Sequence, residues 1–114
     1  MSNQTVKDGK AIAIISYLTF IGTIIAFVMN QDKRNSFASF HIRQTVGLFM
    51  LGFVTTFIKR FSYNDWLGNI LAFGLLILWI IGFIGAIQGE EKRIPLLGDQ
   101  FQQWFKILVK FKNN

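Results

Sequence analysis

The sequence predicts an all-α integral membrane protein with three transmembrane helices and a C-terminal amphipathic helix at the membrane interface. Three observations predict this fold. Residues 11–29 and 67–87 contain no charged residue, 52% of the 114 residues are hydrophobic, and most basic residues flank the apolar blocks. A bilayer core about 30 Å thick takes ~20 apolar residues at about 1.5 Å each, so both blocks are long enough to cross it.

The domain organisation follows from these blocks. We expect a polar segment over 1–10, a three-helix transmembrane domain over 11–88, and a cytoplasmic turn with an amphipathic helix over 89–114. The expected spans are about 11–29, 37–58 and 67–87.

The middle span is less regular than the other two. It is free of charge only over 45–58, about 21 Å of helix, so it crosses the bilayer only if it starts near Phe37. We therefore expect His41, Arg43 and Gln44 to lie at the interface, with the Arg43 side chain extending toward water. Ser36 is the expected N-cap of this helix.

Charge and composition limit the kinds of partner and site. The net charge is +6, but the basic residues stand beside the apolar blocks, which favours membrane topology over nucleic-acid binding. The chain has no cysteine and one histidine, so we expect no disulfide, no thiolate site, no His/Cys metal cluster and no cofactor. The expected partners are membrane lipids, other membrane proteins or further copies of the chain.

The distribution of basic residues predicts the orientation. With three spans, the N-terminus and the second loop share one side with four basic residues, while the first loop and the C-terminal tail share the other with eight. Because basic residues are enriched on the cytoplasmic side, we expect a cytoplasmic C-terminus in a bacterial inner membrane.

The segment that opens the middle span is the sharpest local motif. Its candidate residues for a partner or interface contact are Phe37, Phe40, His41, Arg43 and Gln44. His41 and Gln44 are three residues apart and so share a helix face. They can bind a partner or a lipid headgroup, or simply satisfy helix ends within the fold. We expect no catalytic residue, because no carboxylate lies within a span to relay a proton and Ser39 points away from His41.

Two further sets of residues are candidates for contacts. Small residues four apart allow close helix packing within the chain or between subunits, and they are Gly22, Ala26, Gly82 and Ala86. A helix capped by Asp99 is expected to lie on the membrane surface through Phe101, Trp104, Phe105, Lys106, Leu108, Lys110 and Lys112.

The order of these features resembles a family of small bacterial multi-pass membrane proteins of unassigned function, related to the Tic-type component of the chloroplast protein-import translocon. The resemblance covers residues 11–98. It is carried by Ser16-Tyr17, by Phe40-His41-x-x-Gln44 with Gly47-Leu48, by Gly85-Ala86 to Gly89-Glu90, and by the turn from Pro95 to Gly98. It implies a helical membrane protein that works beside translocation or other membrane machinery.

These observations predict a non-enzymatic accessory or structural subunit of a larger membrane assembly. Two alternatives stay open. One is a component of an oligomeric channel or transporter, with His41 and Gln44 lining a mouth. The other is a membrane-surface regulator that acts through the basic amphipathic tail.

Overall fold

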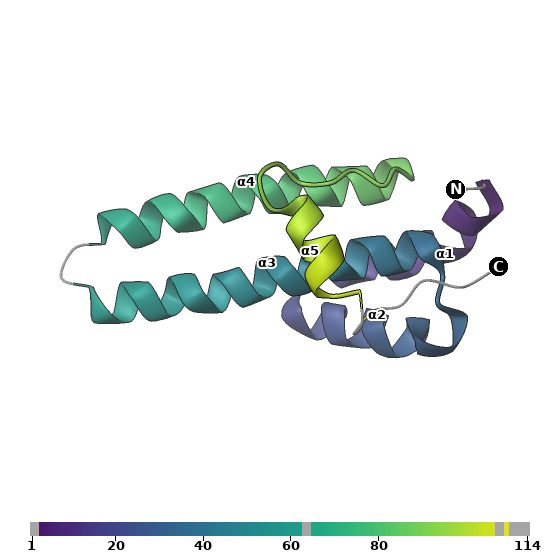
Figure 1. Ribbon diagram of the computed structural model, residues 1–114, viewed down its shortest axis with the longest axis horizontal. Helices are drawn as coiled ribbons and strands as arrows, with labels where there is room; N and C mark the ends of the chain where they lie inside the picture. Colours follow the sequence, from purple (N-terminus) through teal and green to yellow (C-terminus); the bar gives the residue numbers. More distant parts are fainter. Residues whose placement is uncertain (1–2, 63–64, 107–108, 110–114) are drawn as a thin grey trace.

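The computed structural model describes residues 3–62, 65–106 and 109 of the chain. They form an all-helical protein, shown in Figure 1. The helices are α1 (Asn3–Leu18), α2 (Phe20–Lys33), α3 (Ser36–Phe61), α4 (Trp66–Gln88) and α5 (Gly98–Trp104).

The first apolar block forms two helices rather than one. The backbone of Thr19 is extended (φ −154°, ψ 172°), and its side chain caps α2 by accepting a hydrogen bond from the Gly22 nitrogen. The chain then turns back, and the side chain of Asn35, just after α2, donates to the carbonyl of Thr5 near the start of α1. The helices α1 and α2 are therefore an antiparallel hairpin.

This hairpin is about half as long as α3. Its apolar arms, 11–18 and 20–29, have lengths of about 12 and 15 Å, against roughly 15 Å for half of a bilayer core. At its tip, the Phe20 ring lies 5.8 Å from that of Phe49 and 5.2 Å from that of Phe53, near the middle of α3. The expected single span over 11–29 is thus folded in two, and three transmembrane helices are not confirmed.

Two helices of the described residues, α3 and α4, are long and apolar enough to cross a membrane. They form a long antiparallel pair that extends beyond the hairpin tip (Figure 1). Asn35, rather than the expected Ser36, caps α3 by accepting a hydrogen bond from the Ala38 nitrogen. The first half of α3 is buried on all sides from Phe37 to Thr45, whereas α4 exposes most of its apolar side chains.

The chain folds back on itself after α4. Gly89 ends α4 in the left-handed conformation (φ 76°), and the nitrogen of Glu90 bonds to the Gly85 carbonyl. Residues 89–97, here called the return segment, then run back toward the middle of α3 (Figure 1). A Cβ atom at Gly85 would lie 2.8 Å from the Lys92 Cβ, so the segment passes directly over α4.

The return segment leads into α5, which packs against α3. The ring of Phe101 rests on Gly47, where any side chain would overlap it. This helix is shorter than expected and has no side-chain cap, because it begins at Gly98 with Leu97 at the N-cap position. Asp99, the expected cap, lies within the first turn and forms an ion pair with Arg93 at 2.7 Å. Leu108, Lys110 and Lys112 of the expected surface helix lie outside the described residues.

Much of the outer surface of the described helices is apolar. Large side chains of α2, the second half of α3 and α4 are more than a third exposed, among them Ile25, Phe57 and Ile77. Soluble monomers rarely expose continuous apolar patches of more than a few hundred Å². This surface is suited to lipid.

Candidate functional site

A buried polar cluster lies where α1, α3 and α4 meet the return segment. The Tyr17 hydroxyl lies 2.7 Å from His41 Nδ1 and 3.0 Å from Gln44 Nε2, and His41 Nε2 lies 2.8 Å from the Glu90 carbonyl oxygen. Tyr17, His41 and Gln44 are all fully buried. The polar residues of the Phe40-His41-x-x-Gln44 motif therefore face the interior of the protein.

The proton positions in this cluster follow from its geometry. The Glu90 carbonyl can only accept, so His41 Nε2 must donate to it. If the imidazole is neutral, Nδ1 then accepts from the Tyr17 hydroxyl, and that hydroxyl oxygen accepts from Gln44. Each donor has one acceptor in this arrangement, so the cluster is consistent with a neutral His41 protonated on Nε2.

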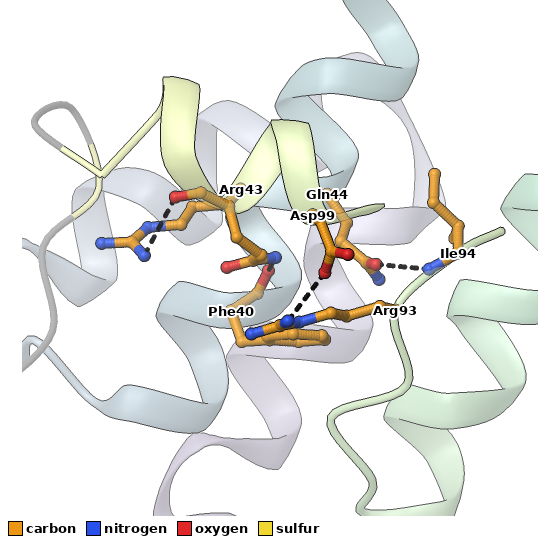
Figure 2. Close-up of polar contacts among 7 residues, drawn as sticks. Phe40, Arg43, Gln44, Arg93, Ile94 and Asp99 are labelled. Atoms are coloured by element: carbon orange, nitrogen blue, oxygen red, sulfur yellow. Dashed lines mark hydrogen bonds and ion pairs between the residues drawn. The ribbon is translucent and has the colours of Figure 1, made fainter. Parts of the chain in front are cut away.

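The cluster also binds the backbone of the return segment. Besides the bond from His41 to Glu90, Gln44 Nε2 donates to the Lys92 carbonyl at 3.2 Å, and Gln44 Oε1 accepts from the Ile94 nitrogen at 2.8 Å. Figure 2 shows Gln44 facing this nitrogen. The return segment has no helix of its own to pair these peptide groups, so side chains of α3 pair them instead.

Side chains in the same region bind the carbonyl groups that the helix break at Thr19 leaves without a helical partner. A continuous helix would use the carbonyls of Ser16 and Tyr17 for its next turn, and the break frees both. The Thr23 hydroxyl donates to the Ser16 carbonyl at 2.7 Å, and the Trp79 indole donates to the Tyr17 carbonyl at 2.8 Å. Trp79 in the middle of α4 therefore stabilises the turn of the hairpin.

Arg43 holds the C-terminal segment. Its guanidinium donates to the carbonyls of Val109, Gln102 and Lys106 at 2.7, 3.3 and 3.3 Å. Arg43 is only 7% exposed, so the expected extension of this side chain toward water is not what the structure shows. Because carbonyls at a helix C-terminus carry partial negative charge, a cation is favourable at this position.

Gln102 completes the contact between α5 and α3. Its Nε2 donates to the Phe40 carbonyl at 2.8 Å. Its buried Oε1 has no hydrogen-bond partner among the described residues. A glutamine three residues after Asp99 is the pattern of a capping box, so local spacing gives no signal for this contact with α3.

A second polar cluster, which the sequence analysis did not identify, fixes the turn between α2 and α3. The Asn30 amide donates to the Ser39 hydroxyl at 2.8 Å and accepts from the Asn35 nitrogen at 2.9 Å. Asn30 and Ser39 are buried. A lone asparagine at the end of an apolar block resembles an ordinary loop residue, so the sequence carried little signal.

The small-residue pairs lie inside the fold. Gly22 faces the backbone of α1 at Ile15, and Ala26 is fully buried in a cluster with Ile12 and Ala38. Gly82 lies against the Tyr17 ring, and Ala86 is buried in the main core.

Aromatic rings pack closely around His41. Phe37 and Phe40 lie 4.8 and 5.0 Å from the imidazole, both edge-on. Within the described residues, no group of three His, Cys, Asp or Glu could hold a metal ion. The arrangement joins helices and backbone segments, and among its buried side-chain nitrogen and oxygen atoms in the described residues only Gln102 Oε1 lacks a hydrogen-bond partner.

The chain is similar to two proteins of the archaeon Methanocaldococcus jannaschii. It is 30% identical over 94 residues to UPF0132 membrane protein MJ1443, an alignment that covers 79% of this chain and 82% of the relative. It is 25% identical over 105 residues to UPF0132 membrane protein MJ1527, covering 90% of this chain and 74% of the relative. No protein-family model matches the chain, and no solved structure matches it. The Tic-type relationship and a bacterial origin stay predictions.

We predict that Tyr17→Phe lowers the free energy of unfolding in detergent by about 1–3 kcal/mol, because it leaves His41 and Gln44 short of a buried partner. Combined with Gln44→Leu, it should show a coupling of about 0.5–3 kcal/mol in a double-mutant cycle.

Thr56→Val is the matched control, since the Thr56 hydroxyl is exposed and bonds only to the Gly52 carbonyl of its own helix. It should change the stability by no more than about 0.5 kcal/mol. Equal effects of Tyr17→Phe and Thr56→Val would contradict the role assigned to the cluster.

Proposed function

We propose that this chain, which belongs to the UPF0132 family of membrane proteins, is a non-enzymatic accessory or structural subunit of a larger membrane assembly. The polar residues that could have supported chemistry or transport are used within the fold. The Tyr17, His41 and Gln44 side chains bind one another and the return segment, and Arg43 binds the C-terminal carbonyls. The surface that remains available for contacts with other molecules is the apolar exterior.

One face of α4 carries the proposal. Its exposed residues recur at alternating steps of three and four positions, and they are Ile70, Phe73, Ile77, Ile80, Ile84 and Ile87. We call this row the α4 seam. Such spacing keeps a row of side chains along one side of a helix, where a second helix can pack against them. The seam runs along nearly the whole of α4 and has no covering helix within the described residues.

The alternatives receive less support. His41 and Gln44 have no exposed surface, so neither is placed to line the mouth of a channel. Phe101 is 2% exposed against α3, whereas a surface-binding helix would direct this side chain into lipid. The resemblance to an import component makes protein-translocation machinery the first assembly to test.

The hairpin also suggests a topology. We propose that α1 and α2 enter the membrane from one side, turn at Thr19 near the midplane and return to the same side, while α3 and α4 cross completely. Irregular backbone at that depth is tolerated when it is buried in protein, and Thr23 and Trp79 bind the freed carbonyls here. Both termini, the turn after α2 and the return segment then share one side.

Charge supports this topology more strongly than three full spans. Six described basic residues lie at the shared end, namely Lys7, Lys10, Lys33, Arg34, Lys92 and Arg93, whereas Lys59 and Arg60 alone lie at the other. With three spans, Lys7 and Lys10 would share a side with Lys59 and Arg60 and weaken the bias. We therefore place both termini in the cytoplasm, in the cytoplasmic membrane of a prokaryote.

The topology predicts the labelling of single cysteines with a membrane-impermeant maleimide. The chain has no cysteine, so Asn3→Cys, Ser62→Cys and Glu91→Cys can be made without removing any. Asn3→Cys and Glu91→Cys should be labelled from the same side, and Ser62→Cys from the opposite side. Labelling of Asn3→Cys and Ser62→Cys from one side would instead support three full spans.

The subunit role predicts that native-nanodisc purification from the source membrane recovers a second membrane protein with the chain. Ile77→Ala with Ile80→Ala should reduce that recovery at least tenfold, because both residues lie in the α4 seam. Ile24→Ala with Ile25→Ala is the matched control, since these residues are equally exposed on α2 and should leave recovery unchanged. A wild-type protein that is always recovered alone would refute the role.

A further inference from the structure

A groove of about 370 Å³ separates α3 from α4 in the half of the molecule beyond the hairpin tip. Figure 1 shows that α1 and α2 do not extend along this half, so the two long helices alone form its walls. Gly52, Thr55 and Lys59 line it on α3, and Ala72, Leu75 and Trp79 line it on α4.

The walls of the groove favour an apolar guest. A Cβ atom at Gly52 would have no other atom within 4 Å, so the groove is open at this point. The Thr55 hydroxyl donates to the Leu51 carbonyl at 2.9 Å, and that of Thr56 donates to the Gly52 carbonyl at 3.0 Å. Both hydroxyl protons are therefore used in hydrogen bonds within α3, and the two threonines present mainly methyl groups and oxygen lone pairs.

A positive charge closes one end of the groove. The stem of Lys59 packs against Gly68 of α4, where any side chain would overlap the Lys59 Cγ. This contact holds Lys59 between the two helices. Its ammonium forms no ion pair within the described residues. Because Lys59 lies in the last turn of α3, it stands at the level of the lipid headgroups.

The dimensions distinguish between possible occupants. The groove is open to the exterior, and its volume of about 370 Å³ is smaller than the ~1,000 Å³ that ten residues of a helix 10–12 Å in diameter fill, so a partner helix could insert only side chains into it. An acyl chain is thin and flexible enough to lie along a groove of this volume. From Leu48 to Lys59 the groove spans about 16 Å of helix, close to half the thickness of a bilayer core.

We propose that this groove binds one anionic phospholipid of the leaflet opposite the termini. An acyl chain fills the space between α3 and α4 from Trp79 outward, and the phosphate lies beside the Lys59 ammonium. The lipid thereby completes the half of the bundle that the short hairpin does not reach. The lipid site is independent of the subunit role, because loss of a protein partner would leave the amount of lipid bound in the groove unchanged.

Native mass spectrometry of the full chain, purified from membranes in a mild detergent, tests the site. The wild-type protein should retain one phospholipid, and Gly52→Leu should lower its occupancy at least fivefold by filling the groove. Gly74→Leu is the matched control, because a Cβ at Gly74 also has open space around it but Gly74 does not line the groove. If Gly52→Leu reduces helicity in circular dichroism, Ala72→Leu on the opposite wall replaces it.

Nanodiscs with equal amounts of phosphatidylglycerol and phosphatidylcholine test the headgroup. The wild-type protein should retain phosphatidylglycerol preferentially, and Lys59→Gln should reduce that preference about fivefold, the effect of one basic residue beside an anionic headgroup. Arg60→Gln is the control, because Arg60 does not line the groove, and it should reduce the preference by less. Equal lipid retention by the Gly52 and Gly74 variants would overturn the proposal. So would loss of a cross-linked dimer, rather than of lipid, in Gly52→Leu.

Discussion

The rest of the structure depends on the need to hydrogen-bond every peptide group that leaves a helix in an apolar setting. An unpaired backbone group in hydrocarbon costs several kcal/mol. Two places where the described chain leaves helical geometry lie beside its main apolar core, at Thr19 and along the return segment. At Thr19, the freed carbonyls bind Thr23 and Trp79, and along the return segment the peptide groups bind His41 and Gln44.

Tyr17 links these two departures from the helix. Its backbone carbonyl belongs to the broken turn and binds Trp79, while its hydroxyl bridges His41 and Gln44, which hold the return segment. The first half of α3 is thereby enclosed on all sides, and Arg43 of the same helix fixes α5. A short hairpin on one side of the midplane leaves the other half of α3 and α4 without a covering helix, where we place the lipid, and the partner helix packs along the α4 seam.

The sequence predicted the membrane-protein class and the helical fold, because these depend on composition and on local spacing. It did not predict the break at Thr19, since a threonine within an apolar block is compatible with a continuous helix whose hydroxyl bonds to its own backbone. It predicted that Arg43 and Gln44 lie at the interface. Their hydrogen-bond partners in the structure, Val109 and Ile94, lie about fifty or more residues away in the sequence. Such distant pairing leaves no local pattern.

The protonation state of His41 tests the central account most directly, because the chain contains a single histidine. Nitrogen-15 NMR of protein labelled at histidine, reconstituted in bilayers at neutral pH, resolves the two ring nitrogens. The account predicts one neutral tautomer, protonated on Nε2 and bare on Nδ1, together with a hydrogen bond from Nε2 to the Glu90 carbonyl. An imidazolium, or an average over both tautomers, would show that His41 is open to water and would contradict the account.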